Sequence, residues 1–190
     1  MFKETSLGLL AALSLGAAQA STLYSDIAGT GPLTSPGGHN VIFNSGVTPA
    51  NLTFTLDGYN SLDGDGNGYT DVFHLNLNGT EVFSGSFALG GGGQDMVYLN
   101  TLGATVNLVN TRPGMVDWAG GAVGISLSFN TVAGLNQIGF SYSGDMQGLS
   151  DEAWGLHGLT VTAVPEPGSL ALMLAGLGAV GGLARRRRLG

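Results

Sequence analysis

Residues 63–71, with the sequence DGDGNGYTD, place oxygen-bearing side chains at alternate positions. The candidate metal ligands are the side chains of Asp63, Asp65, Asn67 and Asp71 and the main-chain carbonyl of Tyr69. A hard cation such as Ca²⁺ takes about six to eight oxygen ligands, and Gly68 permits the sharp turn that such a loop requires. The spacing therefore predicts a calcium-binding loop, and Asp57 or Glu152 is a candidate for completing the shell.

The spacing of this loop resembles known calcium-binding loops, and it can also be explained without a metal. Its spacing resembles the first nine positions of an EF-hand loop, but His74 stands at the twelfth position and the flank reads as a strand. The closer resemblance is to the calcium loops of β-rich extracellular proteins, where affinities are on the order of 10⁻⁴–10⁻³ M. The alternative is a polar hairpin loop without metal, because Asp, Asn and Gly are the usual residues of turns.

Two tryptophans are candidates for ligand contact. Trp118 lies in the loop-like stretch RPGMVDWAGG, where an exposed aromatic ring can serve a ligand. Trp154 follows the acidic pair Asp151-Glu152, and an acidic residue beside an exposed Trp can bind a sugar by stacking and hydrogen bonding. For Trp154 we favour the alternative, in which the ring begins the last strand and fills the core.

Catalytic motifs are absent from the sequence. His39, His74 and His157 are isolated, without an H-x-H or H-E-x-x-H pattern, and no serine lies in a G-x-S-x-G elbow. Asp151 and Glu152 are adjacent, so on a strand they point to opposite faces. We predict that the protein is not an enzyme and assign no catalytic residue, although the members of a Ser-His-Asp site can lie far apart in sequence.

Apolar and polar residues alternate through most of the chain. Period-two patterns predict strands in residues 52–56, 73–77, 105–109, 123–129, 138–142 and 154–162. Asn78-Gly79 between two such runs predicts a type I′ hairpin, and no helical periodicity precedes Pro167. The sequence predicts an all-β fold, an antiparallel β-sandwich of jelly-roll-like topology, with an eight-stranded barrel as the alternative.

The composition of residues 21–163 fits one extracytoplasmic domain. These residues include 11 acidic side chains and a single basic one, Arg112, for a net charge of −10 with histidine neutral. So strong an acidic bias argues against binding to nucleic acid or anionic lipid, and it fits either divalent cations or a charged extracellular protein that stays soluble. The chain contains no cysteine, so disulfides do not stabilise it.

The N-terminus has the features of a secretory signal peptide. Lys3 precedes a short apolar run, and the run ends in the A-x-A sequence Ala18-Gln19-Ala20. We predict a signal peptide over residues 1–20, with cleavage between Ala20 and Ser21. The protein is therefore expected to be exported across the inner membrane.

The C-terminus combines three parts in a fixed order. Pro165, Glu166 and Pro167 precede 17 uncharged residues, 168–184, which as a helix would span roughly 25 Å and reach the low end of what crosses a bilayer. The basic cluster that follows consists of Arg185, Arg186, Arg187 and Arg188. The sequence predicts a transmembrane helix at 168–184 with the arginines on the cytoplasmic side.

These C-terminal features resemble a PEP-CTERM sorting signal, over residues 164–190. The resemblance implies processing by an exosortase, a membrane-embedded cysteine protease-transpeptidase that cuts near the Pro-Glu-Pro motif. It also implies a host that makes exopolysaccharide or biofilm matrix, with the protein transiently anchored in the membrane and then at the cell surface or outside the cell.

A second resemblance concerns the body of the protein. The segments DVFHLNLNGTEVF and LSDEAWGLHGLTV resemble those of lectin-like or galactose-binding-like sandwich domains. His157-Gly158 stands where that pattern has Asp-Asn, so the resemblance bears on the fold and not on sugar binding.

Three functional hypotheses follow from the sequence. The first is a non-catalytic surface or matrix protein, sorted by its tail and stabilised by calcium. The second is a calcium-dependent carbohydrate-binding module that attaches cells to exopolysaccharide. The third and weakest is a polysaccharide hydrolase, for which two carboxylates would have to face each other about 5–9 Å apart across a cleft.

Overall fold

The computed structural model describes residues 20–164, 175–179 and 181. Ala20–Val164 form a compact unit, and residues 175–179 and 181 are helical. Within these described residues, no helix has the length and apolar character needed to cross a membrane. The predicted signal peptide up to residue 19, the Pro-Glu-Pro motif, the arginine cluster and most of the predicted membrane helix lie outside the described residues.

The compact unit is built from antiparallel strands. In chain order they are β1 (Thr22–Asp26), β2 (Thr30–Thr34), β3 (Gly37–Ser45), β4 (Pro49–Asn60), β5 (Val72–Leu77), β6 (Thr80–Ser86), β7 (Met96–Asn100), β8 (Thr105–Asn110), β9 (Gly121–Asn130), β10 (Gly134–Ser143) and β11 (Glu152–Ala163). Every run that the period-two pattern predicted lies within one of these strands. No local pattern in the sequence predicted β1, β2, β3 or β7.

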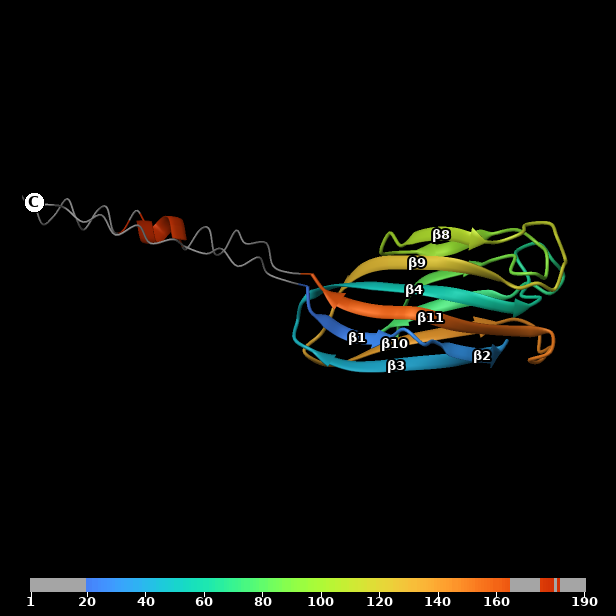
Figure 1. Ribbon diagram of the computed structural model, residues 1–190, viewed down its shortest axis with the longest axis horizontal. Coiled ribbons are helices and arrows are strands. Elements are labelled where there is room, and N and C mark those ends of the chain that lie inside the picture. Colours follow the sequence, from blue (N-terminus) through green and yellow to red (C-terminus); the bar gives the residue numbers. More distant parts are fainter. Residues whose placement is uncertain (1–19, 165–174, 180, 182–190) are drawn as a thin grey trace, which may run out of the picture. The chain divides into compact units, whose positions relative to one another are not determined.

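The strands form two sheets packed face to face (Figure 1). One sheet has the order β1-β11-β4-β9-β8, with β2 also paired to β11, and the other has the order β3-β10-β5-β6-β7. Their first four strands, β1-β11-β4-β9 and β3-β10-β5-β6, follow the strand order of a jelly roll, to which β7 and β8 add one strand each. The predicted all-β antiparallel sandwich is confirmed, and the alternative of a single barrel is wrong because the strands form two separate sheets.

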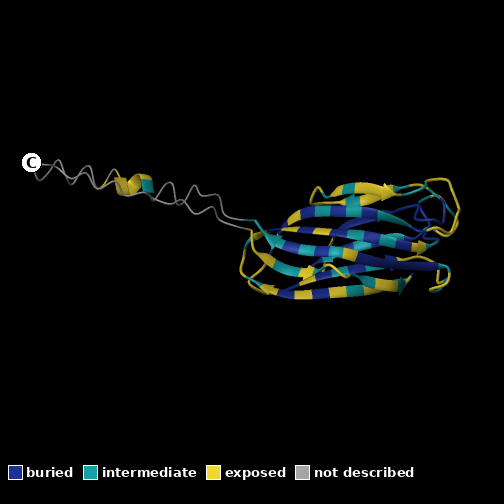
Figure 2. Ribbon diagram, in the orientation of Figure 1, coloured by how far each residue is buried: buried dark blue, intermediate teal, exposed yellow. Residues whose placement is uncertain are grey.

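Period-two alternation places one face of each central strand in the core (Figure 2). Leu52, Phe54 and Leu56 of β4 are at most 3% exposed, and the residues between them face outward. Phe54 packs edge-on against Phe140 with a centroid distance of 5.1 Å. Each such large apolar side chain contributes about 1.5–3 kcal/mol when fully buried, so this unit has a continuous core of its own and can fold without the flanking segments.

Strand β8 departs from the expected half-buried pattern. Leu108 and Val109 are 49% and 60% exposed, and Val106 alone packs against the core from this strand. The physical reason is position: β8 is an edge strand that pairs only with β9, so little of the opposite sheet covers it.

The two ends of the sandwich differ in the loops that connect their strands. The predicted hairpin is confirmed, since Asn78 and Gly79 join β5 to β6 with φ angles of 50° and 81°. The connections at residues 61–71, 87–95, 111–120 and 144–151 lie at the other end, away from Ala20 and Val164 (Figure 1). We call this the loop end. Side chains that are distant in sequence meet there.

Candidate functional site

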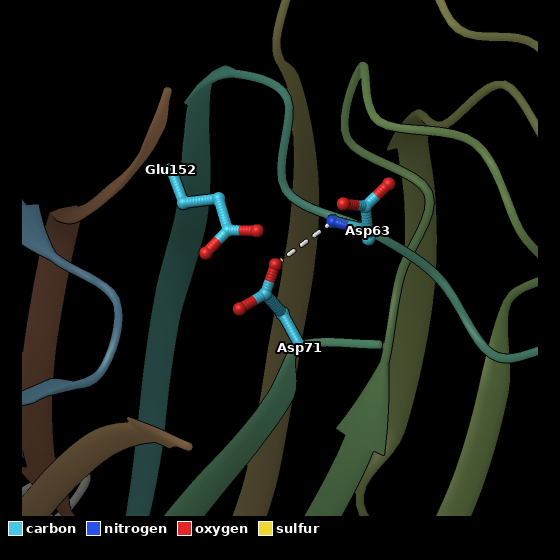
Figure 3. A group of neighbouring side chains, drawn as sticks. All are labelled: Asp63, Asp71 and Glu152. Carbon is cyan, nitrogen blue, oxygen red and sulfur yellow. Dashed lines mark hydrogen bonds between the residues drawn. The ribbon is translucent and has the colours of Figure 1, made fainter. Parts of the chain in front are cut away.

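Three buried carboxylates meet at the loop end (Figure 3). Asp63 comes from the β4–β5 connection, Asp71 immediately precedes β5, and Glu152 is the first residue of β11. One carboxylate oxygen from each lies within 4.8 Å of the others, and the three residues are 6%, 0% and 0% exposed. We call this group the carboxylate cluster.

Main-chain hydrogen bonds hold two members of the cluster in place. The Asp63 N–H donates to Asp71 Oδ2 at 3.0 Å, and the Asp71 N–H donates to the Asp63 carbonyl at 3.1 Å. The buried Ser35 hydroxyl donates to Asp71 Oδ1 at 2.6 Å. The Ser86 hydroxyl lies within 3.1 Å of the carbonyl oxygens of both aspartates. Residues 63–71 are thereby closed into a ring, with the Asp71 carboxylate fixed inside the protein.

Only one of the two carboxylate oxygens of Glu152 has a hydrogen-bond partner. Its Oε1 accepts a hydrogen bond from the Gln147 side-chain amide at 2.5 Å, whereas its Oε2 is buried without a partner. The hydroxyl of Tyr142 is also buried without a partner. Buried polar atoms without partners are rare in folded proteins, so these two atoms require an explanation.

The electrostatics of the cluster are unfavourable for three ionised carboxylates. Burial, followed by repulsion from Asp71 and the other acids, raises the pKa of Asp63 to about 7 and that of Glu152 to about 8. Burial also raises the pKa of Asp71, although the hydrogen bonds from Ser35 and Asp63 oppose that shift. Burial and the Asp71 charge raise the pKa of the Tyr142 hydroxyl well above its usual value.

Within residues 20–164, no cationic side chain neutralises the cluster. Arg112 is the only lysine or arginine in residues 21–163, and its guanidinium contacts Asp117 and Asn110 instead. A buried carboxylate must be paired with a cation or protonated, because leaving it charged and unpaired in the interior is costly. Bound protons or a bound metal ion are therefore the means of neutralisation that the described residues leave open.

Two glycines allow the main chain to approach the cluster closely. A Cβ at Gly144 would lie 2.6 Å from Asp71 Oδ1, and a Cβ at Gly91 would overlap Asp63 Oδ1. Gly91 belongs to the run of four glycines at residues 90–93. That run therefore has a packing role at the carboxylate cluster, which the sequence pattern did not reveal.

The structure brings together only part of the predicted metal loop. Asp63 and Asp71 meet, but Asp65 Oδ1 accepts a hydrogen bond from the Tyr98 hydroxyl at 2.6 Å. The Asn67 side-chain amide contacts Asp63 Oδ1, and its Oδ1 accepts the Tyr69 N–H at 3.0 Å. The predicted ligands within residues 63–71 therefore do not all converge on one position.

Of the two residues considered for completing the shell, only Glu152 lies at the cluster. Asp57 instead pairs with His157 at 2.5 Å. Glu152 is separated from Asp63 by most of the domain in sequence. Glu152 could be proposed as a ligand from the sequence because it is acidic and precedes the last strand. Its location beside Asp63 and Asp71 follows only from the fold.

An open pocket lies beside the carboxylate cluster. It has a volume of about 290 Å³, and its lining includes Asp63, Tyr69, Val116, Trp118 and Gln147. Trp118 is 54% exposed and Tyr69 is 56% exposed, so two aromatic rings are available to solvent at one pocket. Trp118 has a φ of 56°, a conformation rare for a bulky residue and more frequent at functional sites. We call this the Trp118 pocket.

Trp154 does not take part in such a surface. It is fully buried, its Nε1–H donates to the Thr34 carbonyl at 2.8 Å, and its ring packs against Tyr142 at 5.4 Å. The inclusion of Trp154 among possible ligand contacts is therefore wrong, and the core alternative is confirmed. The reason is that its position on β11 falls on the inward phase of the strand.

A second polar group lies on the outer face of the β3-β10-β5-β6-β7 sheet. His74 Nε2 is 2.8 Å from the Ser143 hydroxyl, and His74 Nδ1 is 2.8 Å from Glu81 Oε1. In the sequence His74 is isolated. Its two partners come from other strands, Glu81 from β6 and Ser143 from β10. The three side chains have the hydrogen-bond order of a Ser-His-Glu triad. They lie on an open, solvated sheet face, however, without the enclosed setting that favours nucleophilic catalysis.

Comparison with known proteins identifies one segment of the chain. Residues 163–188 match the PEP-CTERM protein-sorting motif. The chain carries a PEP-CTERM sorting motif. The resemblance seen in the C-terminal residues is thus confirmed. No curated protein matches the chain.

Solved structures of carbohydrate-binding modules are similar to this chain. One is CBM35 from Cellvibrio japonicus Abf62, with 16% identity and a TM-score of 0.30 over 77% of this chain and 92% of that one. Another is Xyl-CBM35 in complex with a glucuronic acid-containing disaccharide, with 17% identity and a TM-score of 0.28 over 79% of this chain and 96% of that one. Similarities this weak do not bear on what this chain binds.

Proposed function

We propose that this chain is an exported, exosortase-sorted protein of the cell surface or extracellular matrix, without catalytic activity and stabilised by calcium. The observation that carries this proposal is the PEP-CTERM protein-sorting motif at residues 163–188. The predicted signal peptide at the other end of the sequence agrees with export. The acidic body, with its single arginine, suits an extracellular protein that binds divalent cations.

The C-terminal residues have the properties that a membrane-embedded processing enzyme requires. Pro165 and Pro167 disfavour helix, so the sequence predicts an extended segment around Glu166. The apolar residues that follow are long enough to hold the tail in the membrane until it is removed, with the arginines on the cytoplasmic side. The exosortase is thus the first partner of the protein, and exopolysaccharide is the second.

Arrangement of the acidic residues argues against hydrolysis. The carboxylate oxygens of Asp63, Asp71 and Glu152 converge within 4.8 Å and are buried together. A glycoside hydrolase instead places two carboxylates on either side of the scissile bond, about 5–9.5 Å apart, with the sugar between them. The carboxylate cluster leaves no space for a sugar between its members, so a role as hydrolase is disfavoured.

The Trp118 pocket favours a second candidate function, a calcium-dependent carbohydrate-binding module. Exposed aromatic rings bind the apolar faces of sugars, and nearby polar groups bind the hydroxyls. Trp118 and Tyr69 supply the rings, and Gln147 and Asp151 supply polar groups at the same pocket. Asp63 belongs to both the pocket and the carboxylate cluster, which would make sugar binding depend on calcium.

Mass spectrometry of the protein from its own host tests the proposed sorting. We expect a mature chain that begins at Ser21 and ends near residue 165. The same chain from a host without exosortase should extend to Gly190. A mass that runs through Gly190 in both hosts would contradict processing and leave a single-pass anchor.

Glycan binding tests the second candidate. Residues 20–164 would be assayed against a panel of bacterial polysaccharides, with calcium and with chelator. Binding to one glycan class that requires calcium and is lost in Trp118→Ala would support the carbohydrate-binding module. Leu108→Ala is a matched control, because Leu108 is similarly exposed on β8, outside the Trp118 pocket. Absence of binding by the folded domain would favour the structural role.

A further inference from the structure

We infer that Asp63, Asp71 and Glu152 form a Ca²⁺ site that ties the β4–β5 connection to the first residue of β11. The inference rests on the calcium-stabilised part of the proposed function. It moves the ion from the linear loop of residues 63–71 to a cluster that exists only in the folded chain. Asp65 and Tyr69, which the sequence pattern suggested as ligands, have no part in it.

Unpartnered buried atoms point to a missing ligand at this position. Glu152 is fully buried, yet its Oε2 has no hydrogen-bond partner. The Tyr142 hydroxyl is buried without a partner as well. After burial, the charge of Asp71 is the second cause that raises its pKa. A metal ion would coordinate the Glu152 oxygen, and a water bound to that ion would accept a hydrogen bond from the Tyr142 hydroxyl. One ligand would thus satisfy both atoms.

The spacing of the carboxylates fits a single Ca²⁺ ion. Two oxygens bound to the same Ca²⁺ lie at most roughly 5.2 Å apart, twice the longest usual Ca–O distance. The three carboxylates offer oxygens within 4.8 Å of one another. Figure 3 shows the Asp71 and Glu152 carboxylates facing each other, with Asp63 at the side of the same space. Three oxygens 4.8 Å apart would lie roughly 2.8 Å from a common centre, so small movements of the side chains, without rearrangement of the main chain, would bring them to one ion.

The chemistry of the donors selects the class of ion. All three are carboxylate oxygens, which suit hard cations and not the softer ions that prefer imidazole or thiolate. Ca²⁺ accepts a flexible shell of protein oxygens, whereas Mg²⁺ demands a near-ideal octahedron and retains most of its water. A buried site assembled from a loop and a strand end therefore fits Ca²⁺ better. Its two positive charges would also offset most of the charge that the cluster carries when ionised.

Calcium titration of residues 20–164, stripped of metal with chelator, tests the site. The domain's melting temperature should rise by roughly 5–10 °C when free Ca²⁺ is about 100 times its Kd. Calorimetric titration with Ca²⁺ alone should give one site per chain. Glu152→Gln should weaken the affinity at least about 10-fold, since it removes a charged ligand but keeps the shape and the hydrogen bond from Gln147.

Asp65→Asn is the matched control for Glu152→Gln. It removes one acidic charge from the linear loop, but Asp65 contacts Tyr98 and lies outside the cluster. Its calcium affinity should stay within about twofold of the unchanged domain. In chelator, Glu152→Gln should melt at or above the unchanged domain, because the neutral amide replaces a carboxyl group that is costly to ionise at this buried position. A lost calcium response would then not be a failure to fold.

The possible outcomes distinguish a failure of the cluster site from a failure of the calcium part of the proposed function. If Asp65→Asn abolishes the calcium response and Glu152→Gln keeps it, the ion lies in the linear loop. The cluster site is then overturned, while a calcium-stabilised surface protein survives. If the unchanged domain shows no calcium response, both the cluster site and the calcium part of the proposed function are wrong. Processing by the exosortase is tested independently by the mass of the mature chain.

Discussion

The two ends of the sandwich solve the same problem, that of closing the core, in different ways. At the hairpin end, Asn78 and Gly79 make a two-residue turn, and the Asn78 Oδ1 accepts the Gln137 N–H at 2.8 Å. At the loop end, longer connections bury Asp63, Asp71 and Glu152 without a basic side chain beside them. One end uses local turn chemistry with satisfied polar groups, and the other keeps charge in the interior.

This difference determines how each end should respond to solution conditions. The polar groups of the tight turn are neutral and paired, so pH and calcium should leave it unchanged. Buried carboxylates depend on what neutralises them, which is protons at low pH and a cation when one is bound. The stability of the loop end is therefore expected to depend on pH and calcium, and three experiments test this contrast.

The largest effect should be a pH dependence of stability in chelator. The folded pKa values of Asp63, about 7, and Glu152, about 8, lie above their ordinary values of 3.8 and 4.5. Between about pH 4 and pH 8 the folded protein thus binds more protons than the unfolded protein, so its stability falls as pH rises. We expect a loss on the order of a few kcal/mol from pH 5 to pH 8, measured by urea unfolding.

Two comparisons make this pH experiment decisive. The double variant Asp63→Asn, Glu152→Gln should flatten the dependence, because neither replacement titrates in this range. Saturating calcium should also flatten it, since the ion replaces the protons. Stability that is constant or rises from pH 5 to pH 8 in chelator would show that the cluster does not control the loop end.

A medium effect is expected from Gly91→Ala at the loop end. The added methyl group would overlap Asp63 Oδ1 and the Ser61 carbonyl, so the domain should lose about 1–3 kcal/mol and bind calcium more weakly. Gly68→Ala is the control, because nothing lies within 4 Å of its Cβ position and its φ is not positive. Equal unfolding free energies for the two variants would argue against close packing of the glycine run on the cluster.

The smallest effect is expected from Gly79→Ala at the hairpin end. Its φ of 81° is unfavourable for alanine, so we expect a loss of about 1 kcal/mol. The loss should be the same with calcium and with chelator, as judged by urea unfolding in both buffers. A calcium-dependent loss would mean that the two ends are coupled and that the contrast drawn between them fails.

Residue patterns predicted the central strands well and the edges poorly. Leu52, Phe54 and Leu56, or Phe73, Leu75 and Leu77, alternate with polar residues, and the alternation follows from which face of a strand is buried. Strand β2, with the sequence TGPLT, has no such alternation and pairs with the beginning of β11. Its position depends on a neighbour more than 100 residues away in sequence, which a local pattern cannot encode.

The sequence by itself determined the class of fold, the β5–β6 turn and the sorting motif, because each is written in neighbouring residues. It also singled out Asp63 and Asp71 as chemistry-bearing residues. The fold was needed to bring Glu152 to them and to give Asp65 and Asn67 other partners, whereas the sequence already favoured an exposed Trp118 and a buried Trp154. The physical reason is that jelly-roll strand order brings the start of the last strand against the loop before β5, so the site forms only when the two sheets have packed.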